Sequence, residues 1–188
     1  MQSVLREKLL IQAIRLAEIS RVYRTESHRF VDAYFVWLEN AARDLSSLRS
    51  PIVILLQAET SSLTSVLDGN MPSGIQTGNS IRKCQKAAAA QSLERISKEI
   101  YTKIEQIDQS LEQFSEKFCH AIAVLASKDP ALFEDIQANQ QGIITVWNKL
   151  GQTPETIPIY NYFCAALSTA DRDYLLLDII QNVVNNRL

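Results

Sequence analysis

Apolar residues recur every three or four positions along most of this chain, which is the period of an amphipathic α-helix. Residues 1–49 contain neither Gly nor Pro, and their apolar stripe keeps its phase across residues 24–27. The pattern therefore predicts either one long helix or two collinear helices over residues 2–49. This stripe consists of Leu5, Leu9, Ala13, Leu16, Ile19, Tyr23, Phe30, Tyr34, Trp37, Ala41, Leu45 and Leu48.

A second stripe follows the four alanines at 87–90 and predicts a helix from Asn79 or Ser80 to about Ser127. At about 1.5 Å per residue this helix is roughly 70 Å long, so it has to pack along another long helix or reach into a partner. The remaining faces carry polar side chains, as in a coiled coil or bundle with one buried seam. The stripe consists of Leu93, Ile96, Ile100, Ile104, Ile107, Leu111, Phe114, Phe118, Ile122 and Leu125.

Proline and glycine mark the ends of shorter helices. Ser-Pro at 50–51 and Asp-Pro at 129–130 each combine an N-cap oxygen with a proline in the first turn, where the missing N–H is tolerated. Gly151 is predicted to end the second of these helices. Residues 68–79 contain three of the five glycines and are predicted to form the one long loop. The shorter helices are predicted at 52–67, 130–150, 159–167 and 170–186.

These elements predict an all-α protein, an elongated helical bundle built on two long antiparallel helices plus three or four shorter ones. We expect a single domain over residues 1–188, with a long helical hairpin at about 2–127 and a C-terminal helical segment at about 129–187. The shorter helices cannot cover two helices of roughly 70 Å, so apolar surface should remain exposed, which is typical of binding sites. The pattern therefore predicts a homo-oligomer or a complex with another protein.

Composition and charge narrow the possible partners. The chain has 188 residues, of which 46% are hydrophobic and 21% charged, and its net charge is −2, so no global basic field favours nucleic acid. Residues 1–100 nevertheless carry a net charge of +3 and residues 101–188 one of −5. Opposite signs in the two halves indicate that the halves pack together or that one end meets a partner.

The cysteines and the apolar runs bear on the location of the protein. Cys84, Cys119 and Cys164 are odd in number and widely separated, which is typical of thiols in a reducing compartment. Cys119 and Cys164 stand among Phe, Ala and Ile, so we expect them to be small core residues. The N-terminus has no signal-peptide pattern, and the most apolar run, 52–56, is too short to span a bilayer. We expect a cytoplasmic protein without membrane insertion.

The chain lacks the clustered titratable residues that catalysis requires. Neither histidine belongs to a zinc or di-iron motif, and no glycine-rich phosphate-binding motif occurs. One acidic strip has the helical spacing used by magnesium sites in helical enzymes, but no second inward-facing acidic pair accompanies it. We interpret the strip as a solvated face and predict no catalytic residue, metal or cofactor. The strip consists of Glu105, Asp108, Glu112 and Glu116.

Two kinds of residue are candidates for contact with a partner. Arg and His side chains on the first predicted helix, and a basic group beside the glycine loop, could meet phosphates or an acidic surface, or could be an ordinary solvated face. An aromatic cluster near the C-terminal helices could pack a hinge or, where exposed, anchor a partner. The basic residues are Arg21, Arg24, His28, Arg29, Arg82, Lys83 and Lys86, and the aromatic ones are Trp147, Tyr160, Tyr162 and Phe163.

Three functions remain possible from the sequence. The first is a non-enzymatic helical-bundle protein that acts through protein–protein interaction, as an adaptor, accessory subunit or regulator. The second is a small helical subunit of a nucleoprotein assembly that contacts the phosphate backbone through the basic residues. The third is a metal-dependent enzyme that uses the acidic strip. The long amphipathic helices and the lack of clustered catalytic chemistry favour the first.

Overall fold

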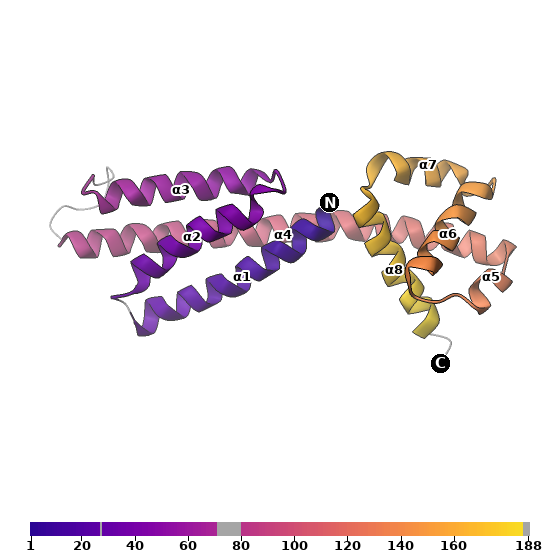
Figure 1. Ribbon diagram of the computed structural model, residues 1–188, viewed down its shortest axis with the longest axis horizontal. Helices are drawn as coiled ribbons and strands as arrows, with labels where there is room; N and C mark the ends of the chain where they lie inside the picture. The colour runs from indigo at the N-terminus through magenta and orange to yellow at the C-terminus, as the bar shows by residue number, and fades with distance from the viewer. Residues whose placement is uncertain (27, 71–79, 186–188) are drawn as a thin grey trace. The chain divides into compact units, whose positions relative to one another are not determined.

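The computed structural model describes residues 1–26, 28–70 and 80–185 (Figure 1). These residues form eight helices and no strand, so the prediction of an all-α protein is confirmed. Most of the predicted loop at 68–79, and Asn79 as a helix cap, lie outside the described residues. The helices are α1 (Gln2–Thr25), α2 (Phe30–Ser46), α3 (Pro51–Leu67), α4 (Ile81–Lys128), α5 (Ala131–Glu134), α6 (Gln140–Gln152), α7 (Ile157–Ala166) and α8 (Thr169–Asn185).

The chain divides into two compact units, and the division falls within α4. The N-terminal unit is Leu5–Glu105, and the C-terminal unit is Met1–Val4 together with Gln106–Leu188. The sequence predicted one domain with a segment boundary near 127–129, and folding of the two units as a single domain stays a prediction. None of the described helices has both the length and the apolar character needed to cross a membrane.

The N-terminal unit is a bundle of α1, α2, α3 and the first part of α4 (Figure 1). The helical period of each segment places one apolar stripe toward the shared core, where α2 packs along α3. Burial of these side chains is the main contribution to the stability of this unit. The most deeply buried large apolar residues include Leu9, Leu16, Phe30, Tyr34, Leu38, Leu45, Leu56, Leu63, Ile96 and Ile100.

A polar pair inside this core joins α2 to α4. The Tyr34 hydroxyl lies 2.8 Å from the Ser92 hydroxyl, and both side chains are buried. Burial raises the pKa of the Tyr34 phenol far above its ordinary value, so the group is neutral and the pair acts as a hydrogen bond. Glu59 on α3 is buried beside it and forms an ion pair with Arg95 at 3.2 Å.

The prediction of one long helix or two collinear helices over residues 2–49 is wrong. The Arg15 guanidinium on α1 lies 3.1 Å from the Asp44 carboxylate near the end of α2, so α1 and α2 form an antiparallel hairpin. The ring of Tyr23 meets the edge of Phe30 at 4.9 Å across the turn. Reversal of the chain brings both aromatic rings together, which a straight helix cannot do. Consequently α4 is the one long helix among the described residues, with 48 residues.

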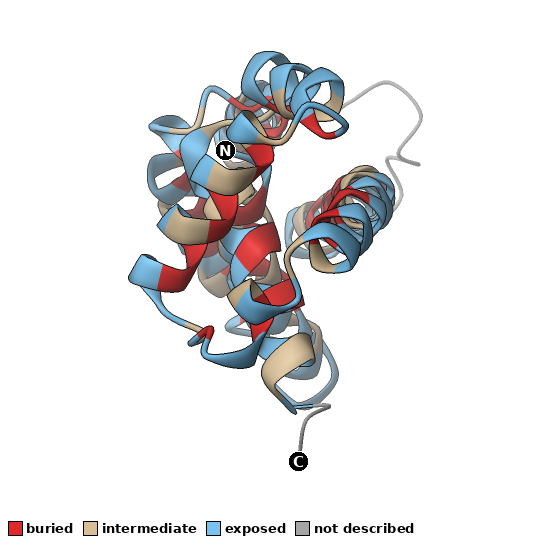
Figure 2. Ribbon diagram, turned by 90° about the vertical axis from the view of Figure 1, so that its right-hand side faces the viewer, coloured by how far each residue is buried: buried red, intermediate tan, exposed pale blue. Residues whose placement is uncertain are grey.

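The C-terminal unit surrounds the second part of α4 with α5, α6, α7 and α8 (Figure 1). The rings of Phe118 and Phe163 stack at 3.7 Å in its centre and join α4 to α7. Figure 2 colours the ribbon by burial and shows buried and exposed positions alternating along the helices. Other buried residues of this core are Leu125, Val146, Leu150, Leu176 and Ile180.

The predicted helix at 130–150 is interrupted between α5 and α6. The Asn139 side chain accepts a hydrogen bond from the Gly142 N–H at 3.0 Å and caps the new helix. A Cβ atom on Gly142 would lie 2.0 Å from the Gln137 carbonyl oxygen, so this close approach requires glycine. Gly151 does not end α6, which continues to Gln152, and its missing side chain instead makes room for the Tyr160 ring.

A buried carboxylate joins the start of α1 to the start of α8. Both N–H and Oγ–H of Ser3 donate to Asp171 Oδ1 at 2.7 Å, and Ser168 Oγ–H donates to Oδ2 at 2.7 Å. The Met1 α-amine also contacts Oδ2. Burial alone raises the pKa of the Asp171 carboxyl, but these donors outweigh it and hold the pKa far below its ordinary value.

Candidate functional site

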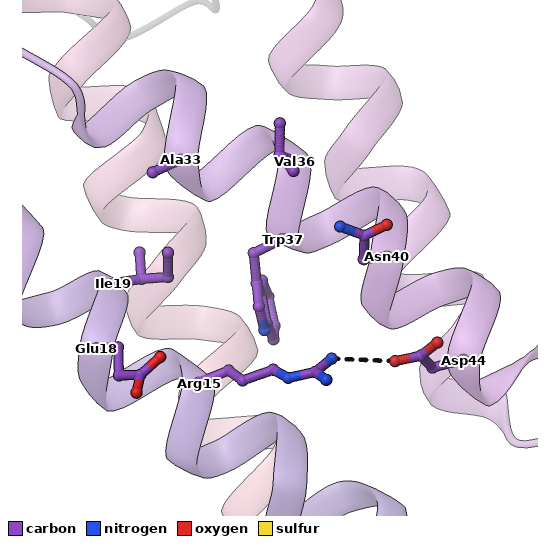
Figure 3. Close-up of a pocket in the computed structure, with 8 residues that line it drawn as sticks. All are labelled: Arg15, Glu18, Ile19, Ala33, Val36, Trp37, Asn40 and Asp44. Carbon is purple, nitrogen blue, oxygen red and sulfur yellow. Dashed lines mark hydrogen bonds and ion pairs between the residues drawn. The ribbon is translucent and has the colours of Figure 1, made fainter.

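An open pocket of about 490 Å³ lies between α1 and α2 in the N-terminal unit (Figure 3). A second pocket of about 420 Å³ shares Ala33 and Val36 with the first and continues it toward the turn between the two helices. We call the two pockets together the α1–α2 groove. Its residues are Arg15, Glu18, Ile19, Val22, Glu26, Arg29, Asp32, Ala33, Val36, Trp37, Asn40 and Asp44.

Charged and apolar side chains line the groove together, and its floor includes apolar residues because α2 carries more of them than its core face needs. Phe30, Tyr34 and Leu38 on one face of α2 are fully buried in the unit. Val36 lies on another face, and 55% of its surface is exposed. A β-branched apolar side chain exposed inside a concave surface is a feature of binding sites.

Trp37 is the buried wall of the groove. Only 5% of its surface is exposed, and its ring stacks on Tyr34 at a centroid distance of 5.8 Å. The indole projects from α2 toward α1, with its nitrogen end directed toward Arg15 (Figure 3). The indole N–H is buried and has no hydrogen-bond partner among the described residues. Buried polar groups are normally hydrogen-bonded, so this donor indicates that an acceptor from a bound molecule belongs beside it.

The charges along the groove are only partly compensated. Arg15 pairs with Asp44 at 3.1 Å, and Gln12 Nε2 donates to the same carboxylate oxygen at 3.1 Å. Arg29 pairs with Glu26 at 3.0 Å.

Both guanidinium groups of the groove are thereby engaged. The two remaining carboxylates, Glu18 on α1 and Asp32 on α2, are exposed and have no ion-pair partner in the described part of the chain.

The predicted basic residues all lie in the N-terminal unit. The Lys86 ammonium on α4 lies 4.4 Å from the centre of the Tyr23 ring, and Tyr23 stands between Arg21 and Arg24 on α1. This contact brings the end of α1 next to the start of α4, where Arg82 and Lys83 are exposed (Figure 1). His28 and Arg29 are exposed just before α2 begins. Two clusters that are separate in the sequence therefore share one end of the unit.

The predicted aromatic residues lie together in the C-terminal unit. The rings of Trp147 and Tyr160 are 4.5 Å apart, and Phe163 and Tyr162 pack on the side of α4 that carries Phe114. Phe163 and Trp147 are buried, whereas 41% of Tyr162 is exposed. The Lys117 ammonium donates to the Tyr162 hydroxyl at 3.1 Å, so the exposed ring is already in contact with a cation of its own unit.

The expectation that Cys119 and Cys164 are core residues is wrong. Both are exposed, whereas Cys84 is buried. Their sequence neighbours Phe118 and Phe163 occupy the inward positions, and consecutive side chains on a helix point about 100° apart. The neighbouring Cys164 side chain is the main cause that raises the pKa of the Tyr160 phenol.

Sequence reasoning missed the α1–α2 groove. Trp37 and Val36 belong to the stretch 30–38, which is apolar around most of the helix. The signal available was the excess of apolar residues over what one core face requires. The hairpin that turns this excess into a groove is a tertiary feature.

Among the described residues, no group of three His, Cys, Asp or Glu side chains is arranged to hold a metal ion. Comparison with protein-family models, curated proteins and solved structures finds no significant match to this chain. The fold and site therefore define a class, an all-α protein with an open interhelical groove, without assigning a family.

Proposed function

We propose that this chain is a non-enzymatic helical-bundle protein that binds another protein through the α1–α2 groove, as an adaptor, accessory subunit or regulator. The observation that carries the proposal is the open groove with exposed Val36 on its floor and the buried, unpartnered indole N–H of Trp37 in its wall. Docking of an amphipathic segment would cover Val36 and the other apolar side chains of the groove, and burial of apolar surface is the usual driving force of such recognition. Because its exposed thiols suit a reducing compartment, the cytoplasm is the expected location.

Further apolar surface on α1 extends the groove. Ile11 and Ile14 are 49% and 65% exposed. They precede Arg15 and Glu18 by one helical turn, so they lie on the same face of α1 as these groove residues. A partner that fills the groove can therefore continue along α1, which enlarges the apolar area removed from water.

Replacement of Val36 by Asp is expected to reduce association by about tenfold or more, because a carboxylate would have to be desolvated on the groove floor. The measurement is the amount of partner, or of a second copy, that co-purifies with the chain from its native source, with light scattering of the purified protein. Ile54→Asp is the matched control, since Ile54 is 71% exposed on α3 and lies outside the groove. A monomer at high micromolar concentration without a recovered partner would contradict the proposal, as would equal losses in both variants.

A second candidate function is a subunit of a nucleoprotein assembly. The observation that favours it is the contact between Lys86 and Tyr23, which brings the end of α1, with Arg21 and Arg24, next to the start of α4, with Arg82 and Lys83. Arginine and lysine side chains at such an end can contact a phosphate backbone. The candidate basic residues are Arg21, Arg24, His28, Arg29, Arg82, Lys83 and Lys86.

If this candidate is correct, affinity for a short RNA or DNA duplex should fall steeply between about 50 and 200 mM salt, because bound phosphates release counterions. The double variant Arg24→Glu/Arg82→Glu should weaken binding and flatten the salt dependence. Arg43→Glu/Lys98→Glu changes the same charge at exposed positions away from this end and should behave as wild type. Fluorescence anisotropy measures all three proteins. Absence of salt-dependent binding, or equal loss in both double variants, would exclude these basic residues of the N-terminal unit as a nucleic-acid site.

A further inference from the structure

We infer that the α1–α2 groove takes an amphipathic helix of a partner protein that carries Lys or Arg beside its apolar stripe, with these cations facing Glu18 and Asp32. This inference rests on the proposed function and specifies the chemistry of the partner. It depends on three features of the groove: its uncompensated charge, the donor of Trp37 and the helical character of both walls.

The charge of the groove selects a basic partner. Arg15 is held by Asp44 and Arg29 by Glu26, so neither guanidinium is available to an incoming carboxylate without loss of an existing pair. Glu18 and Asp32 stand on opposite walls, one on α1 and one on α2, with no ion-pair partner among the described residues. A helix with cations on both sides of its apolar stripe would compensate both carboxylates at once, whereas an acidic helix would meet only repulsion from them.

The indole N–H of Trp37 provides a second, independent indication of an occupant. It is a donor on a side chain that is 95% buried, it lines the groove, and it has no acceptor within the described residues. The Arg15 side chain that lies toward it is held only by an exposed ion pair, and exposed ion pairs rearrange at little free-energy cost. Displacement of Arg15 would let the indole donate to an oxygen of the occupant.

The walls of the groove favour a helix over an extended peptide. Both walls are helices, whose backbone N–H and C=O groups are paired within α1 and α2. An extended peptide would find no strand edge there and would leave its own backbone groups unpaired where they cover the apolar side chains of the groove. A helix satisfies its backbone internally and presents only side chains, so it can pack over the groove against both α1 and α2.

Trp37 can report occupancy of the groove directly. The chain has two tryptophans, so Trp147→Phe leaves Trp37 as the one indole emitter. The probes are two tryptophan-free helical peptides of about 18 residues, one built from Leu and Lys and the other from Leu and Glu with the same apolar stripe. The Leu–Lys peptide should change the Trp37 emission in a saturable way, with an affinity about tenfold or more above that of the Leu–Glu peptide.

Charge reversal tests the pairing with Glu18 and Asp32. In the Trp147→Phe background, Glu18→Lys/Asp32→Lys should weaken the Leu–Lys peptide about tenfold and strengthen the Leu–Glu peptide. Glu112→Lys/Glu116→Lys makes the same charge change at exposed positions outside the N-terminal unit and should leave both affinities unchanged. Circular dichroism verifies that each variant is folded.

The possible outcomes separate this inference from the proposed function. Equal binding of both peptides, an unaltered preference in Glu18→Lys/Asp32→Lys, or no emission change with either peptide would overturn the basic partner. Val36→Asn changes the groove without adding a charge. A preference for the Leu–Glu peptide that Val36→Asn abolishes would overturn the inference and leave the groove as a protein-binding site. Binding of either peptide that Val36→Asn does not weaken would refute the groove itself.

Discussion

Ile100→Asp is expected to unfold the N-terminal unit. Ile100 lies on α4 and is completely buried, so the new carboxylate would have to be desolvated in the core or the core would have to open. We expect a loss of about 4–5 kcal/mol in the free energy of unfolding, which is close to the whole stability of a domain at the lower end of the usual range of about 5–15 kcal/mol. Urea denaturation followed by far-UV circular dichroism measures this loss.

The neighbouring residue provides the control for this substitution. Tyr101 stands next on the same helix, and 52% of its surface is exposed. Tyr101→Asp should therefore change the free energy of unfolding by less than about 1 kcal/mol. Similar losses in the two variants would mean that α4 does not bury the face on which Ile100 lies.

Asp171→Asn is expected to lower the free energy of unfolding by about 2–4 kcal/mol near neutral pH. The buried carboxylate accepts hydrogen bonds from Ser3 and Ser168 and contacts the Met1 α-amine, and an amide loses the charge and one acceptor oxygen. Thermal or urea denaturation of both proteins at one pH gives the difference. Asp178→Asn, at an exposed position of α8, is the control and should be close to neutral.

The effect of Asp171→Asn should also depend on pH. The pKa of Asp171 is depressed in the folded chain, so its stabilising contribution is complete above the unfolded pKa of about 3.9 and is lost as the pH falls toward the folded value. The difference between wild type and variant should thus be largest above about pH 5 and shrink toward pH 2. A difference that stays constant over this range would show that the charge of Asp171 is not what stabilises the fold.

Most helix positions could be predicted from local sequence pattern. Ser-Pro at 50–51 and the apolar period predicted a helix at 52–67, and α3 is Pro51–Leu67. The long stripe from Leu93 predicted a helix ending near Ser127, and α4 ends at Lys128. These signals depend on residues no more than about four positions apart, which is the range of a helical hydrogen bond or an N-cap.

The errors arose where contacts between distant side chains decide the path of the chain. No Gly or Pro marks the turn between α1 and α2, which depends on the packing of Tyr23 against Phe30 and of the hairpin as a whole. Gly142 was expected inside a helix, but its role is to let the backbone approach the Gln137 carbonyl. The stripe of a straight helix and that of a hairpin have the same period, so the pattern alone cannot distinguish them.

In the candidate sites, too, the residue types could be read from the sequence, whereas their arrangement depended on contacts between distant side chains. The basic residues of the N-terminal unit were visible in the sequence. The short distance between Lys86 and Tyr23 was not, since the two residues lie on different helices. The groove was missed because a pocket belongs to the space between two elements and not to either of them. Cys119 and Cys164 are exposed because their sequence neighbours Phe118 and Phe163 occupy the core positions, which only the packing of α4 against α7 decides.

Helix content, the ends of α3 and α4, and the lack of a familiar catalytic motif followed from the sequence without a structure, because they depend on local propensity, capping and spacing. The reversal at α1–α2, the unpartnered Trp37 donor and the Ser3–Asp171 contact across 168 residues were decided by the tertiary structure. The physical reason is that burial and charge compensation are properties of surfaces brought together from distant parts of the chain. Local periodicity specifies which face of a helix is apolar, but only packing determines what covers that face and what it leaves open.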